Sequence, residues 1–143
     1  MSDYRFPYKD AEFLFNEIVD FDALCQAGGL EEVNSELASA VFEEANRLAG
    51  EVIAPLNWAG HEKGATLGEQ GVEETPGFKE AYWQMVESGW CSLGFPEDWG
   101  GQGMPQVLAT ATDEIWQSAN LGFSLCTMLT HGAVEALLAH GTD

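Results

Sequence analysis

The chain has 143 residues, 45% of them hydrophobic, which is enough for one compact domain with a buried core. Five Lys and Arg residues stand against 24 Asp and Glu residues, and the formal net charge is -19. Nucleic acids and anionic membrane surfaces are bound through Lys and Arg, so this charge argues against both as partners. We expect the acidity mainly to keep the protein soluble.

The three cysteines, Cys25, Cys91 and Cys126, form no C-x-x-C pair. An odd number without such spacing predicts neither a disulfide framework nor a structural zinc site, and we expect no metal. The N-terminus lacks the apolar segment of a signal peptide, and no apolar run reaches the length of a membrane span without interruption. The sequence therefore predicts a soluble protein of a reducing compartment, the cytoplasm.

We expect residues 1–29 to form an extension that packs on the body of the domain. The Phe6-Pro7 step favours extended backbone, because a proline ring restricts the residue before it. A helix follows and ends at Gly28 and Gly29. The apolar residues of that helix approximate one stripe: Phe13, Leu14, Ile18, Phe21 and Leu24.

The body, residues 30–143, begins with the clearest helix. Asn34 or Ser35 can cap it, since a short polar side chain accepts hydrogen bonds from the free amides of the first turn, and Pro55 must end it. Its apolar residues recur with a 3.6-residue period in two adjacent rows: Leu37, Val41, Leu48 and Val52, then Phe42, Ala45, Ala49 and Ile53. Glutamates lie largely opposite, so we expect these rows to face the core.

Residues 56–75 have no apolar period and are rich in Gly and Glu, which predicts a long irregular connection. Thr75 and Pro76 can then start a helix as its cap and first residue, and Gly89 suits the left-handed position at its end. No segment shows the sustained alternation of a strand. The sequence therefore predicts an all-α fold, an up-down helical bundle.

Met104 and Pro105 begin a further helix, and the segment 121–141 forms the last one. That segment is apolar nearly all round, and its only acid or imidazole side chains are those of His131, Glu135 and His140. A helix without a polar face must be surrounded by protein. We expect it to be central in the bundle, or to be covered by chain outside these 143 residues.

The stretch GFPEDWGGQG at residues 94–103 invites comparison with phosphate-binding loops. A dinucleotide-binding G-x-G-x-x-G motif would need a third glycine where Gln106 stands, and no Gly-Lys-Ser/Thr follows for a P-loop. We therefore predict a rigid structural corner in which Trp99 lays its ring on the neighbouring helices. The residues that give the corner its geometry are Pro96, Trp99, Gly100, Gly101 and Gly103.

His131 and Glu135 are four residues apart and share a helix face. Such a pair can exchange protons or bind metal, but no third ligand is visible, and we favour a hydrogen-bonded pair that orients the helix. No Gly-x-Ser-x-Gly motif and no arrangement of Ser, His and Asp suggests a nucleophile. The chain by itself contains no candidate catalytic residue.

The phrase LGFPEDWGGQGMP and the closing LAHGTD resemble the N-terminal helical domain of the acyl-CoA dehydrogenases. In that family a phrase like L-x-x-P-E-x-(Y/W)-G-G-x-G links two helices, and a phrase like H-G-(T/N)-(D/E) comes after the next helix. The opening YRFPYKDAEFL is similar to the N-terminal extension of the longer subfamily members. The matching positions are Leu93, Pro96, Glu97, Trp99, Gly100, Gly101, Gly103 and His140 to Asp143.

The resemblance implies an oxidoreductase that uses FAD to remove two hydrogens across Cα–Cβ of a fatty acyl-CoA thioester. It also implies electron-transfer flavoprotein as the electron acceptor, a homo-oligomer, and a full enzyme with a β-barrel domain and a second helical bundle. A flavin-contacting phrase like T-E-P-x-A-G-S-D would follow Asp143, and the catalytic glutamate would lie further on. The residues that bind the cofactor are therefore unknown in this chain, and we expect it to be inactive alone.

In the family the last helix of this domain helps to line the acyl pocket. The resemblance places Leu125, Thr127, Met128 and Leu129 near the substrate, although a plain core uses the same residue types. The CoA phosphates would bind largely elsewhere, because cations are few. Two alternatives remain open: an acidic helical interaction module without an enzymatic parent, and the same domain of an acyl-CoA oxidase-like flavoenzyme.

Overall fold

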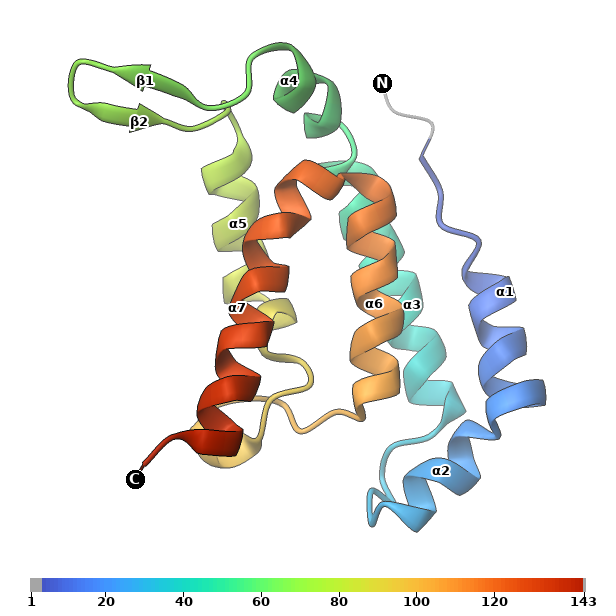
Figure 1. The fold of residues 1–143 in the computed structure, drawn as a ribbon. Helices are drawn as coiled ribbons and strands as arrows, with labels where there is room; N and C mark the ends of the chain where they lie inside the picture. Colours follow the sequence, from blue (N-terminus) through green and yellow to red (C-terminus); the bar gives the residue numbers. More distant parts are fainter. Residues whose placement is uncertain (1–3, 143) are drawn as a thin grey trace.

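The computed structural model describes residues 4–142 as an array of helices with one short hairpin (Figure 1). The α-helices are α1 Tyr8–Phe13, α2 Phe21–Ala27, α3 Ser35–Leu48, α4 Leu56–Glu62, α5 Phe78–Glu87, α6 Gln106–Ala119 and α7 Leu121–His140. Shorter turns of helix are the π-helices η1 Leu14–Val19 and η2 Ala49–Ile53 and the 3-10 helices η3 Trp90–Ser92 and η4 Glu97–Trp99. The strands are β1 Thr66–Gly68 and β2 Gly71–Glu73. The predicted all-α class is confirmed.

The core is built around α3 and its continuation η2. The second of the two predicted rows is fully buried, with 0% exposure at each position: Phe42, Ala45, Ala49 and Ile53. In the first row only Leu48 is buried, and the other members are half-buried. From the other side α6 covers the core with Leu108 and Ile115, which are also 0% exposed. Burial of these side chains is the main favourable term for the fold.

The two ends of α3 follow the predicted signals. Asn34 Oδ1 accepts a hydrogen bond from the Leu37 amide at 2.9 Å, which satisfies one of the free donors of the first turn. At the other end η2 carries the helix to Ile53, and Pro55 then stands at the N-cap of α4. The chain can turn there because proline cannot extend the hydrogen-bond ladder behind it.

The stripe predicted in the N-terminal extension is wrong at four of its five positions. Phe21 is buried, but Phe13, Leu14, Ile18 and Leu24 are all exposed. The physical reason is that the helix does not keep a 3.6-residue period. It widens into the π-helix η1 and then breaks at Asp20, whose φ is 52°. Phe15 therefore turns inward instead, and its ring packs edge-on against Phe42 with centroids 5.0 Å apart.

Two long-range hydrogen bonds fasten the start of the extension to the body. The Tyr4 hydroxyl donates to the Ile115 carbonyl at 2.9 Å, and the Phe6 amide donates to Asn46 Oδ1 at 2.9 Å. Phe6 is itself buried in the core. The extension therefore shares one core with α3 and α6.

The connection between α3 and α5 is not irregular, so that expectation is wrong. It contains α4 and an antiparallel hairpin in which Leu67 pairs with Val72 and Gly68 pairs with Gly71. Each strand has only three residues, too few for alternation to be visible in the sequence. The hairpin projects from the helices (Figure 1), and Leu67 and Val72 are 85% and 73% exposed.

The start of α5 differs from the prediction, and its end agrees with it. The N-cap is Gly77, at φ 89°, and not Thr75, which is buried and accepts a hydrogen bond from the Phe78 amide through its backbone carbonyl. Gly89 ends the helix at φ 80°, the left-handed conformation predicted for it.

The 94–103 loop is a corner held by its own backbone. The Gly101 amide donates to the Pro96 carbonyl at 3.0 Å, the Gly103 amide donates to the Phe95 carbonyl at 2.9 Å, and Gly100 and Gly103 have φ values of 81° and 64°. A Cβ on Gly101 would overlap the carbonyl oxygen of Phe95. Several glycines here are thus required by geometry and not by a ligand.

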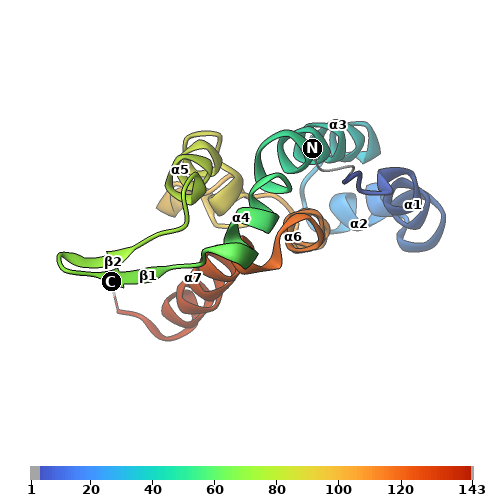
Figure 2. The same ribbon diagram turned by 90° about the horizontal axis from the view of Figure 1, so that it is seen from above.

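Seen from above, α6 lies between α3 and α7, and α7 runs along the margin of the molecule (Figure 2). Among the described residues α7 contacts chiefly α6 and α4. Of the two alternatives predicted for the apolar last helix, a central position is therefore wrong for residues 4–142, and cover by chain outside these 143 residues stays a prediction. Most of its length is exposed because no described element covers its far side.

Phe42→Ala should lower the free energy of unfolding of the 143-residue chain by about 3–5 kcal/mol, because it removes a fully buried ring and leaves a cavity. Urea denaturation followed by circular dichroism measures this. Phe13→Ala is the matched control, since Phe13 is 58% exposed, and it should change the free energy by less than about 0.5 kcal/mol. Similar losses in the two variants would contradict the assigned core.

Gly101→Ala should destabilise the chain by about 1–3 kcal/mol, because the new methyl group must displace the Phe95 backbone. The matched control is Gly132→Ala in α7, where an added Cβ meets nothing within 4 Å. This control should be neutral or up to about 1 kcal/mol more stable, since alanine favours a helix. Thermal denaturation of both variants compares them, and a harmless Gly101→Ala would show that the corner is not close-packed.

Candidate functional site

The candidate site is the surface of α7, which begins at a buried asparagine. Asn120 is 2% exposed, and its Oδ1 accepts a hydrogen bond from the Phe123 amide at 3.1 Å. Its Nδ2 donates to the Ile53 carbonyl at 3.4 Å. One side chain therefore caps α7 and ties its start to the end of η2, which fixes where α7 leaves the core.

The inner face of α7 is narrow. Phe123, Ser124 and Thr127 are its buried residues. The Ser124 hydroxyl donates to the Asn120 carbonyl and the Thr127 hydroxyl to the Ser124 carbonyl, both at 3.0 Å. These small polar side chains are satisfied within the helix itself, so they can be buried without a partner from another helix.

The outer face of α7 is apolar and uncovered. Its exposed large side chains are Leu121 at 56%, Leu125 at 45%, Met128 at 40% and Leu129 at 71%. They span about 12 Å along the first half of the helix. Leu137 and Leu138, also exposed, lie further along on the side that faces the 94–103 loop. Apolar surfaces of this kind mark ligand-binding or protein-binding sites.

By length and composition α7 could also cross a membrane, contrary to the expectation from the sequence. Its most apolar window of 18 residues has a mean hydropathy of 1.3, and 17% of that window is buried. The same composition is found in core helices of soluble proteins, so it shows only that α7 needs an apolar environment.

The four residues predicted to lie near an acyl chain fall on both faces of α7. Leu125, Met128 and Leu129 are on the outer face, whereas Thr127 is 8% exposed and lies on the inner one. None of the four lines the cavities described below. As a group they therefore define an open apolar wall, with Thr127 behind it.

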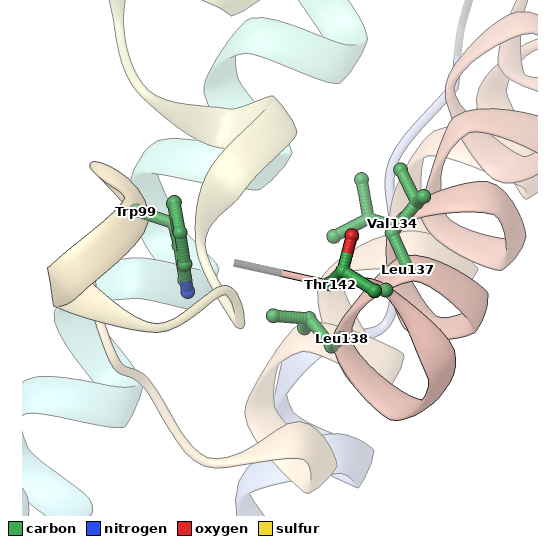
Figure 3. A pocket seen from close by; sticks show the side chains of 6 residues that line it. Trp99, Val134, Leu137, Leu138 and Thr142 are labelled. Carbon is green, nitrogen blue, oxygen red and sulfur yellow. The ribbon is translucent and has the colours of Figure 1, made fainter.

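A cavity of about 420 Å³ lies between the 94–103 loop and the C-terminal end of α7 (Figure 3). Its walls include the Trp99 ring on one side and Val134, Leu137 and Leu138 on the other. Trp99 is 74% exposed, so the expectation that its ring is laid on neighbouring helices is wrong. The tight backbone of the corner turns this ring outward, and it forms one wall of an open apolar cavity instead. Asp143, in the closing phrase of the sequence, lies outside the described residues.

Two further cavities flank the start of α7. One of about 510 Å³ lies at the base of the hairpin and reaches Asn120, and one of about 430 Å³ lies between α5 and α7 and reaches Tyr82 and Cys126. Glu74, Phe78 and Gly122 line both. The two cavities are therefore neighbours along one side of α7.

These cavities do not form a cradle for a flavin dinucleotide. Lys79 is the only Lys or Arg that lines any of the three cavities just described, and the pyrophosphate of FAD carries charge that helix N-termini or cations usually meet. Within residues 4–142 no group of three or more His, Cys, Asp or Glu side chains could hold a metal ion. We therefore assign no cofactor contact to the described residues.

The partner of His131 is a residue of another helix and not the predicted Glu135. His131 Nδ1 lies 3.4 Å from Asp113 Oδ2 on α6, whereas Glu135 is exposed and makes no ion pair with His131 in the described part of the chain. Burial raises the pKa of the Asp113 carboxyl, and nearby His131 partly offsets this rise. The His131 ring also meets Phe95 edge-on, with centroids 5.2 Å apart.

Asp113 was missed because the helix-face rule compares residues within one helix only. A partial signal did exist. A single residue, Asn120, separates α6 from α7, which makes the two helices neighbours in space. This does not give the register, because Asp113 lies seven residues before Asn120 and His131 lies eleven residues after it. The pair links α6, α7 and the 94–103 loop, and it is consistent with the orienting role that was favoured for His131.

Comparison with known proteins agrees with this architecture. The family model for the acyl-CoA dehydrogenase N-terminal domain matches residues 35–143. A relative from Ruegeria pomeroyi, named 3-methylmercaptopropionyl-CoA dehydrogenase, is 38% identical over 140 residues. That match covers 98% of this chain and 24% of the relative, so the chain spans about a quarter of the relative's length. The chain therefore belongs to the acyl-CoA dehydrogenase family, as its all-α N-terminal domain.

Proposed function

We propose that this chain is the N-terminal domain of an FAD-dependent dehydrogenase that oxidises an acyl-CoA thioester between Cα and Cβ. The observation that carries the proposal is the outer face of α7, an apolar surface that no described element covers. An acyl chain is the substrate part that needs such a surface. The family match supports the reaction class and favours an enzyme over an interaction module without an enzymatic parent.

The role of this domain is to bind the acyl chain and to exclude water from it. Each methylene transferred from water to an apolar surface contributes about 0.8 kcal/mol, so even a short chain gains from this contact. Leu125, Met128 and Leu129 are the side chains placed to make it. Thr127 supports them from the inner face, where its hydroxyl is already bonded to Ser124.

The redox chemistry is assigned to polypeptide outside the described residues. FAD, when bound in the full enzyme, would accept the hydrogens and pass electrons to electron-transfer flavoprotein. We also assign binding of the CoA phosphates to polypeptide outside the described residues or to a neighbouring subunit. The chain has only five Lys and Arg residues to meet these charges, and Arg47 already pairs with Glu44 and Glu51. We further propose a cytoplasmic homo-oligomer.

The proposed substrate class is an acyl-CoA, and the length and branching of the acyl group are what an assay has to determine. The Ruegeria relative is named for a short acyl group that contains a thioether. Met128 and the leucines beside it would tolerate such a chain or a plain fatty one, because thioethers and methylenes both prefer apolar surroundings. An acyl-CoA oxidase of the same fold differs in its electron acceptor. Turnover that requires electron-transfer flavoprotein indicates a dehydrogenase, and turnover with oxygen alone indicates an oxidase.

Met128→Trp in the full-length enzyme should move the substrate preference towards shorter acyl chains, because the larger ring fills space beside the wall. We expect kcat/KM for the longest acyl-CoA that the enzyme accepts to fall by about tenfold or more relative to the shortest one. Leu67→Trp is the matched control, since Leu67 is 85% exposed on the hairpin and away from α7, and it should leave the ratio unchanged. If Met128→Trp leaves the ratio of the two kcat/KM values unchanged, α7 does not line the acyl pocket.

The 143-residue chain, purified and supplied with FAD, should not oxidise any acyl-CoA, whereas the full-length enzyme should. The reason is that the cavities described above offer no flavin cradle, and the catalytic base is assigned to polypeptide outside the described residues. Reduction of an artificial electron acceptor in the presence of a series of acyl-CoAs measures both proteins. Turnover by the 143-residue chain would contradict the proposal that the redox chemistry depends on polypeptide outside it.

A further inference from the structure

A second uncovered apolar surface lies far from α7, on the N-terminal extension (Figure 1). We call it the outer face of the extension. Its members are Phe13 at 58% exposure, Leu14 at 52% and Ile18 at 67%, and Leu24, at 45%, is exposed on α2 beyond the break at Asp20. The opposite side of the same segment is buried through Phe15, Phe21 and Cys25. A segment that is apolar on both sides is typical of one enclosed by protein on both sides.

Exposed carboxylates outnumber cations on the segment that carries the outer face. Asp10, Glu17 and Asp20 are exposed on the same segment, and its only cations among the described residues are Arg5 and Lys9. A partner surface that fits this pattern has an apolar centre and Lys or Arg at its rim.

Elsewhere in residues 4–142 this domain offers no such partner surface. Beyond the extension its cations are Arg47, Lys63 and Lys79, and Arg47 is already bonded to Glu44 and Glu51. A second copy of the domain would bring one acidic surface against another, at a net charge of -19 for each copy. Charge therefore disfavours self-association through this face.

The extension accompanies a longer enzyme. The family model begins at residue 35, so the extension is not part of the common domain. The Ruegeria relative nevertheless matches 98% of the chain, and its matched part is 24% of its length. The relative therefore contains the extension and, in the same polypeptide, a much longer part beyond the match. Each molecule thus carries both the extension and a possible docking partner for it.

We propose that the outer face of the extension docks onto another part of the same enzyme polypeptide, a surface with an apolar centre and a cationic rim. The extension then connects two parts of the enzyme. Its inner side packs on α3 through Phe15 and Phe42, and its outer side contacts the rest of the polypeptide. This docking does not depend on which substrate α7 contacts.

Photo-crosslinking of the full-length purified enzyme tests the docking. The variant Ile18→p-benzoylphenylalanine places the photoreactive group in the middle of the outer face. After irradiation we expect a monomer-sized band on a denaturing gel, and peptide mapping should show Ile18 joined to a segment outside residues 1–143. The control is Glu32→p-benzoylphenylalanine at an exposed polar position, which should crosslink several-fold less.

A dimer-sized band would show a second copy at this face and overturn the proposal, as would a yield no higher than that of the control. Ionic strength gives an independent readout. Raising it from about 0.05 M to about 0.5 M screens charges, so the yield should fall several-fold if a cationic rim is involved. A yield that rises with salt would indicate contact between like-charged surfaces. Loss of dehydrogenase activity is not needed for any of these outcomes, so failure here is distinguishable from failure of the proposed function.

Discussion

The row of Phe42, Ala45, Ala49 and Ile53 on α3 has no exposed surface, and the other elements are arranged so as to cover it. The extension closes one side with the Phe15 ring, and α6 closes another with Leu108 and Ile115. Because the row continues through η2, the Ile53 carbonyl lies at the end of the helix and accepts a hydrogen bond from Asn120. That bond sets the origin of α7, so the position of the candidate wall depends on the same row.

Among the described residues, apolar side chains stay exposed on α7 and on the extension after α3 is covered. The two helical segments lie at opposite margins of the array (Figures 1 and 2) and differ in their surroundings. A cavity lies near each end of α7, which suits a small apolar ligand. The outer face of the extension lies on a segment with more carboxylates than cations, which suits a charged protein surface. The two surfaces are therefore given different roles.

The glycines of the 94–103 loop are explained by backbone geometry. They let the chain fold tightly on itself, as at Gly101 beside Phe95. The corner sends Phe95 towards His131 and Trp99 towards the end of α7. The loop thus helps to place α7, and the acid–base pair of Asp113 and His131 lies beside it, where it links two helices.

The sequence by itself determined the all-α class, the two rows of α3 that face the core, a cap at Asn34 or Ser35, the left-handed Gly89 and the family. These features depend on residues close together in the chain, where periodicity and local hydrogen bonding are decisive. Only the tertiary structure decided the partner of His131, the outward turn of Trp99 and the face of the extension that is buried. Each depends on contacts between distant segments, or on a break such as η1 and Asp20 that shifts the register of a helix. It also decided that the apolar α7 lies at a margin, because composition shows that a helix needs cover but not which chain supplies it.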